Sequence, residues 1–260
     1  MVFCRIFIPM KHLLYILSFF LFGLICQAEV GEQMDSTGIS NKIWDELLQK
    51  HVGDMGDVNY KGFVQAKDSL EDYLNILSSN PVNDSWSREA ALAYWINAYN
   101  AFTVKLIVDN YPVESIRDLN PTFYIPMVRT VWHRKFFKIG GKEMNLDTIE
   151  HEILRKKFNE PRIHFAIVCA SKSCPVLLNE SFEEDKIYEQ LDRQTKAFLA
   201  DKSRNIIRED EVEISKIFSW FSGDFTKDGS LIDFLNLYSP IEISEDASIR
   251  YVDYDWSLNE

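Results

Sequence analysis

Glycine and proline are scarce in this sequence, and their scarcity excludes several classes of chain. The 260 residues include 10 Gly and 8 Pro, while 46% are hydrophobic and 26% are charged. This composition excludes a disordered chain, a collagen-like chain and an array of flexible linkers. The chain is long enough to bury a substantial core in one large domain or two small ones.

Basic residues are outnumbered, which disfavours two kinds of partner. Lys and Arg total 28 against 40 Asp and Glu, for a net charge of −12. We therefore expect no nucleic-acid partner and no attraction to an anionic membrane surface. The sequence also contains no phosphate loop, dinucleotide fingerprint or metalloprotease motif, and nothing in it specifies a cofactor.

The first 28 residues have the pattern of a signal peptide. Arg5 and Lys11 precede an apolar run over residues 13–25, and the segment ends on the small residue Ala28. The run is shorter than the roughly 20 apolar residues that a membrane-spanning helix needs. We expect cleavage near Ala28, export to the periplasm or the extracellular space, and no stable membrane insertion afterwards.

The cysteines of the sequence add two expectations. Lipidation at Cys26 is disfavoured because the bulky Ile25 occupies the position where a small residue is normally required. Of the 4 Cys, only Cys169 and Cys174 remain in the mature chain. Their spacing permits a disulfide, as is common in exported proteins, but does not require one.

The mature chain is expected to be a flexible lead-in over residues 29–39 and a single domain over residues 40–260. Its most apolar segment, from Ser87 to about Asn110, predicts a helix buried on all sides at the centre of the domain. Helices and strands do not alternate strictly, which predicts an α+β class. We expect a helix-rich domain around this central helix, with a small, mainly antiparallel sheet.

Patterning also predicts the other elements. Helices are expected over about 40–52, 70–80, 147–158 and 181–200, and after Ser215 and Ser230. A hairpin is expected around Gly140 and Gly141, a second hairpin over 206–214, and an edge strand over 249–256. The apolar run 163–169 predicts a buried strand.

The helix beginning at Asp147 carries two candidate site residues. Glu150 falls in the middle of its apolar arc, where a carboxylate needs a partner or a raised pKa. Glu150 could instead reach back to the backbone as part of a capping box with Asp147. His151 lies beside the arc near the helix N-terminus, where the dipole favours neutral imidazole, and could act as a base.

The apolar run 163–169 ends on the first of the two thiols. If it is a regular strand, Cys169 and His164 point to opposite faces and cannot pair. A nucleophilic Cys169 would then take its base from elsewhere, and His151 is the natural candidate. Cys169 could equally be an inert buried thiol, and Cys174 could be the reactive thiol or half of a bridge.

Two asparagines on the central helix complete the candidate set. Asn97 and Asn100 lie one turn apart where little solvent is available, so each amide must find partners. Asn97 could orient a catalytic histidine, as in Cys-His-Asn sites, or both could brace the core. A zinc site with Cys169 and Cys174 lacks the usual ligand spacing, so we expect no metal ion.

Three motifs resemble the DUF547 family. They are AYWINAYN at residues 93–100, NLDTIEHEILR at 145–155 and HFAIVCASKSCP at 164–175. The similarity extends from about Trp44 to Leu237. The family has no settled activity to transfer.

The resemblance does bear on the candidate residues. Glu150 and His151 match the Ile-Glu-His element of the family, and Asn97 and Asn100 match its Trp-Ile-Asn element. Plant members of the family carry serine at the position of Cys174 and have a cysteine at the position of Cys169. The resemblance therefore favours Cys169 as the functional thiol and argues against an obligatory disulfide.

Two functions remain open, and the sequence leaves open whether the protein is an enzyme. The first is an exported cysteine hydrolase or acyltransferase, similar in logic to papain-like and transglutaminase-like enzymes. Cys169 would be the nucleophile and His151 its base, oriented by Glu150 or Asn97. Asn100, Cys174 and His164 would be supporting residues. The alternative is a non-catalytic module of the cell envelope, which either binds a peptide or another envelope component or has a structural role.

Overall fold

The computed structural model describes residues 37–123 and 129–260, which belong to one compact unit spanning Met34–Glu260. The expected signal peptide, most of the lead-in and part of the loop before the first hairpin lie outside the described residues. Among the helices that the structure describes, none is both long and apolar enough to cross a membrane.

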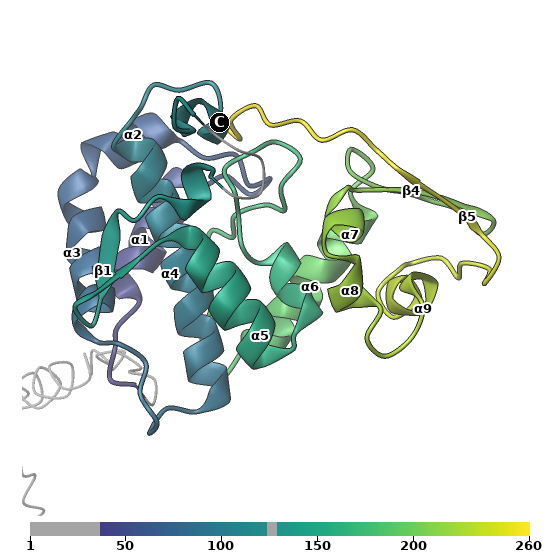
Figure 1. Cartoon of the computed structure of the whole chain (residues 1–260), viewed down its shortest axis with the longest axis horizontal. Helices are drawn as coiled ribbons and strands as arrows, with labels where there is room; N and C mark the ends of the chain where they lie inside the picture. Colours follow the sequence, from purple (N-terminus) through teal and green to yellow (C-terminus); the bar gives the residue numbers. More distant parts are fainter. Residues whose placement is uncertain (1–36, 124–128) are drawn as a thin grey trace, which may run out of the picture. The chain divides into compact units, whose positions relative to one another are not determined.

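The predicted central helix is confirmed as α4, Arg88–Val108 (Figure 1). Every residue of α4 apart from Arg88, Glu89 and Lys105 is buried. The Ser87 side chain accepts the Ala90 N–H and caps the helix, as its position predicts. Against it pack α2 (Tyr60–Gln65), α3 (Lys67–Ser79) and a π-helix (Thr148–Leu154), and α1 (Lys42–His51) packs on α2 and α3.

A second group of helices covers the other part of the domain. The π-helix continues into α5 (Arg155–Phe158), and a short 3₁₀ helix (Pro161–Phe165) follows. The next helices are α6 (Ile187–Ala200), α7 (Ile217–Trp220), α8 (Ser222–Phe225) and α9 (Leu231–Asn236). Phe165 is fully buried in the apolar cluster formed mainly by α6 to α9.

The predicted α+β class is confirmed, with two small sheets. Strands β1 (Phe137–Ile139) and β2 (Lys142–Met144) form the predicted hairpin, and Gly140 and Gly141 both adopt positive φ in its turn. Strands β3 (Ile206–Ile207) and β4 (Glu211–Ile214) are also antiparallel. Strand β5 (Ser248–Tyr251) pairs parallel with β4.

The prediction of a buried strand over residues 163–169 is wrong. After the 3₁₀ helix this segment is irregular, and the Asn100 side chain supplies the hydrogen bonds that a neighbouring strand would have made. Its Nδ2 donates to the Ala166 carbonyl at 2.9 Å, and its Oδ1 accepts the Val168 N–H at 2.9 Å. The argument that placed Cys169 and His164 on opposite faces of a strand therefore does not apply.

Two other boundaries differ from the prediction. Helix α6 begins at Ile187 because Ser181 does not cap it; the Ser181 hydroxyl bonds Glu183 instead. The predicted edge strand ends at Tyr251, because its partner β4 ends at Ile214, whose carbonyl accepts a last hydrogen bond from the Val252 N–H at 2.9 Å.

The C-terminal segment, residues 252–260, runs back toward α2 (Figure 1). Its backbone accepts hydrogen bonds from Lys172 and Ser173, and Asn259 donates to the Ala170 carbonyl. At its end, the Asn259 carbonyl accepts the Val58 N–H at 2.8 Å. The last residues of the chain thus hold the turn that contains both cysteines.

Candidate functional site

A cavity of about 550 Å³ brings together residues that are far apart in the sequence. Its walls come from α4, the π-helix, the cysteine turn, the segment around α7 and the C-terminal segment. Five of the seven candidate residues line it: Cys169, Cys174, Glu150, His151 and His164.

The two asparagines lie outside this lining. Asn97 makes two hydrogen bonds to the Phe182 backbone, donating to its carbonyl at 2.8 Å and accepting its N–H at 2.9 Å. No described contact joins Asn97 to His151, so the orienting role has no hydrogen bond to support it. Asn100 acts on the cavity indirectly, through the backbone that leads into Cys169.

The Cys169 thiol is surrounded by hydrogen-bonding groups. Its Sγ lies 3.0 Å from Cys174 Sγ, 3.2 Å from Ser171 Oγ and 3.3 Å from the Tyr254 hydroxyl. Each neighbour can donate to a thiolate, and a donor stabilises the charged form. The hydrogen bond from Cys174, followed by those from Ser171 and Tyr254, lowers the pKa of Cys169, although partial desolvation of its sulfur acts in the opposite direction.

Cys174 has the opposite character. It is 4% exposed, and burial together with the adjacent Cys169 sulfur raises the pKa of its thiol. Its sulfur accepts the Cys169 N–H at 2.9 Å. Both cysteines are free in the structure. Cys174 therefore stays protonated, and its S–H group donates a hydrogen bond to the Cys169 sulfur.

Glu150 is buried in the cavity wall on the π-helix. Its Oε2 accepts a hydrogen bond from the Tyr99 hydroxyl at 3.1 Å, and burial raises its pKa. The alternative capping-box role is not observed, because Asn145 Oδ1 accepts the Thr148 N–H at 2.7 Å and Asp147 makes no side-chain cap. Glu150 therefore faces the core, as its place on the apolar arc predicts.

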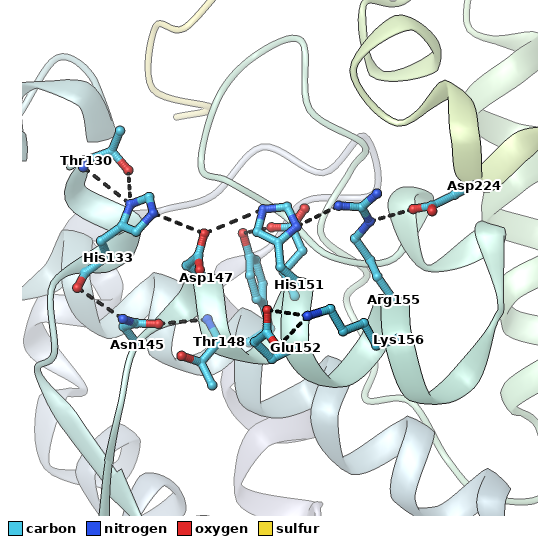
Figure 2. A network of polar contacts seen from close by, with 12 residues as sticks. Thr130, His133, Asn145, Asp147, Thr148, His151, Glu152, Arg155, Lys156 and Asp224 are labelled. Atoms are coloured by element: carbon cyan, nitrogen blue, oxygen red, sulfur yellow. Dashed lines mark hydrogen bonds and ion pairs between the residues drawn. The ribbon is translucent and has the colours of Figure 1, made fainter. Parts of the chain in front are cut away.

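Figure 2 shows a row of polar contacts, and His133, Asp147, His151 and Arg155 of this row line the cavity. Asp147 Oδ1 lies 3.4 Å from His133 Nε2 and 3.6 Å from His151 Nε2. On its other side, His151 Nδ1 contacts Arg155 Nη1 at 2.8 Å. Arg155 Nε in turn donates to Asp224 Oδ2 at 2.6 Å.

This row fixes the tautomer of His151. An arginine side chain can only donate, so His151 Nδ1 must accept and the ring proton lies on Nε2. Among the contacts of the described residues, none joins His151 to the Cys169 thiol. Both line the same cavity. Because Arg155 occupies Nδ1, the other ring nitrogen of His151, Nε2, carries the proton and can only donate a hydrogen bond.

His164 forms the end of the row. Its Nε2 lies 2.8 Å from Asp224 Oδ2, and its ring stacks on Phe221 with centroids 4.0 Å apart. Burial lowers the pKa of His164, although Asp224 works against this. Asp224 bonds both His164 and Arg155, and these contacts outweigh burial and hold its pKa well below the ordinary value.

Stability is expected to fall as the pH drops below about 6.5, the ordinary value for histidine. As the pH falls, His164 is protonated in the unfolded chain before it is protonated in the folded protein. Its contribution to the free energy of unfolding is therefore complete above that pH and is lost as the pH approaches the lower pKa of the folded state. Urea unfolding at about pH 7.5 and about pH 5.5 measures the difference. His164→Phe should reduce the pH dependence of the free energy of unfolding. The pH dependence that remains comes from His51, whose pKa burial also lowers. An unchanged slope would contradict the assignment.

Sequence reasoning missed the aromatic wall of the cavity. Tyr254 and Trp256 come from the C-terminal segment, with ring centroids 4.6 Å apart. Trp220 and Trp132 each lie 5.8 Å from Trp256, and Arg117 lies over the Trp256 ring at 5.2 Å. Alternation in residues 249–256 predicted a strand but carried no information about where the tail crosses the domain.

Residues 83–199 match a family model described as "Protein of unknown function, DUF547". Neither a curated protein nor a solved structure matches the chain significantly. The matched region contains all seven candidate residues and ends before the C-terminal segment that carries Tyr254.

Proposed function

The chain carries a DUF547 domain over residues 83–199, and from the thiol in its cavity we propose that the protein is a cysteine-dependent hydrolase or acyltransferase. The observation that carries the proposal is the Cys169 sulfur, which lies on a cavity of about 550 Å³ among three hydrogen-bond donors. The signal-peptide pattern of residues 1–28 assigns this reaction to an exported protein.

In the proposed reaction, the Cys169 thiolate attacks an acyl carbon and forms a thioester while the leaving group departs. Water or another acceptor then attacks the thioester and restores the thiol. The lowered pKa of Cys169 supplies the thiolate without a hydrogen-bonded imidazole. His151, with its proton on Nε2, is assigned a hydrogen bond to the leaving group, which takes its proton from water, in place of the base expected from the sequence.

A small activated ester such as p-nitrophenyl acetate tests the proposal. In a chain with Cys4 and Cys26 replaced by serine, Cys169 and Cys174 are the only thiols. We expect one acetyl group, on Cys169, and p-nitrophenol release that continues beyond one equivalent. Cys169→Ser should abolish both, while Cys174→Ser should keep the adduct because Cys174 is not the nucleophile. Peptide mass spectrometry locates the acetyl group.

The aromatic wall supports one competing function, a non-catalytic binding module. Tryptophan and tyrosine rings that line a cavity suit a ligand that is held and not converted. That function predicts no turnover, with acetylation no faster in the folded protein than in urea. Such a result would overturn the enzymatic proposal.

A further inference from the structure

We propose that Cys169 and Cys174 form a dithiol that exchanges with small disulfides in the cavity and cycles between two thiols and an intramolecular disulfide. The two sulfurs lie 3.0 Å apart and both line the cavity. A disulfide bond of about 2.0 Å requires them to approach by about 1 Å. The inference depends on the positions of the sulfurs and does not require acyl transfer.

The two thiols differ in the way that exchange requires. Cys169 is partly exposed and Cys174 is buried at 4% exposure. An incoming disulfide therefore reaches Cys169 first. The Cys169 thiolate attacks one sulfur of the substrate and forms a mixed disulfide, and the other half leaves as a thiolate that takes up a proton.

The Cys169 backbone prepares the second step. Its N–H donates to Cys174 Sγ at 2.9 Å. While Cys169 is a thiolate, its charge raises the pKa of Cys174. Once the Cys169 sulfur is bound to the substrate, that charge is gone and the N–H remains to stabilise a Cys174 thiolate.

Cys174 then attacks Cys169 Sγ and displaces the second half of the substrate as a thiol. Across both steps, the protein loses two electrons and two protons, and one disulfide becomes two thiols. The oxidant is the small disulfide itself, and a thiol reductant reverses the cycle.

Hydrogen bonds to the backbone of the turn between the cysteines hold the two sulfurs close together without a covalent bond. Ala170 has a φ of 59°, which bends the chain directly after Cys169. Arg204 donates to the carbonyls of Lys172 and Cys174 at 2.7 and 2.9 Å. The C-terminal segment holds the other side of the turn. Only small movements of the side chains are then needed to close the bridge.

Oxidised glutathione is the probe for the test, again in the chain with Cys4 and Cys26 replaced by serine. We expect the wild-type pair to lose both titratable thiols with no glutathione retained, and a reductant to restore both. Cys174→Ser should stop at one glutathione on Cys169, because the resolving thiol is missing. Cys169→Ser should react far more slowly. Ser173→Ala, which alters the same turn but neither sulfur, should behave as wild type.

Three results would overturn the inference: a wild-type protein that keeps its glutathione adduct, one that keeps both thiols, or equal reaction rates for the two cysteine variants. Thiol titration and intact mass measure all of them. The acetylation experiment uses the reduced protein, so a failure of exchange leaves its outcome unchanged, and Cys174→Ser can fail here while still accepting an acetyl group.

Discussion

Replacing Tyr254 with phenylalanine is expected to slow alkylation of Cys169 by iodoacetamide about tenfold at neutral pH. The Tyr254 hydroxyl lies 3.3 Å from Cys169 Sγ, and burial raises its own pKa, so it is a neutral donor to the thiolate. A hydrogen bond to a charged group contributes about 1.5–3 kcal/mol, and about 1.4 kcal/mol corresponds to one pKa unit. Loss of this donor should therefore raise the Cys169 pKa by about one unit or more.

The pH profile separates this effect from a loss of structure. Below the Cys169 pKa, the variant should react more slowly in proportion to its smaller thiolate fraction, while at high pH the two rates should converge. Tyr60→Phe is the matched control, because its hydroxyl bonds Asn259 in the same C-terminal segment and makes no hydrogen bond to the thiol. If Tyr254→Phe had the wild-type profile, Tyr254 would not stabilise the thiolate.

The parts of the fold that sequence predicted are those whose signal is local. The apolar run after Ser87 predicted a helix buried in the core, and Gly140 with Gly141 predicted a tight hairpin. The segment 163–169 misled because a short apolar run is compatible with any buried backbone. Its conformation is decided by Asn100, which is 66 residues from Ala166 in the chain.

The same division applies to the site. The sequence identified Cys169, His151 and Glu150 as unusual, and the structure places all three in the lining of one cavity. The sequence did not indicate their hydrogen-bond partners, because these come from other elements. Glu150 is bonded by Tyr99 on α4, and Cys169 by Tyr254 in the C-terminal segment. Patterning places a side chain on a face, but the tertiary fold determines which groups that face meets.

The role of His151 shows how one partner changes the chemistry. Its position near a helix N-terminus predicted neutral imidazole that could act as a base. Arg155, one turn later on the same helical segment, occupies Nδ1 and leaves the proton on Nε2. The spacing of His151 and Arg155 is visible in the sequence, but the direction of the arginine is fixed by Asp224, which lies far along the chain on α8.

Replacing Asn100 with alanine is expected to destabilise the protein by about 2–6 kcal/mol, because it leaves two buried backbone groups unpaired at about 1–3 kcal/mol each. Asn97→Ala is a matched comparison: the residue is similarly buried on α4 and makes the same pair of backbone hydrogen bonds, but to Phe182. Urea unfolding should give similar losses for the two variants.

Their effects on the thiol should differ. Asn100 holds the backbone of Val168, directly before Cys169, so its loss should displace the sulfur from its donors and shift the pH profile of alkylation upward. Asn97→Ala should leave that profile unchanged, since its hydrogen bonds hold a segment that lies outside the cavity lining. An upward shift with Asn97→Ala as well would show that Asn97 acts on the site, and would restore the positioning role that the sequence suggested for it.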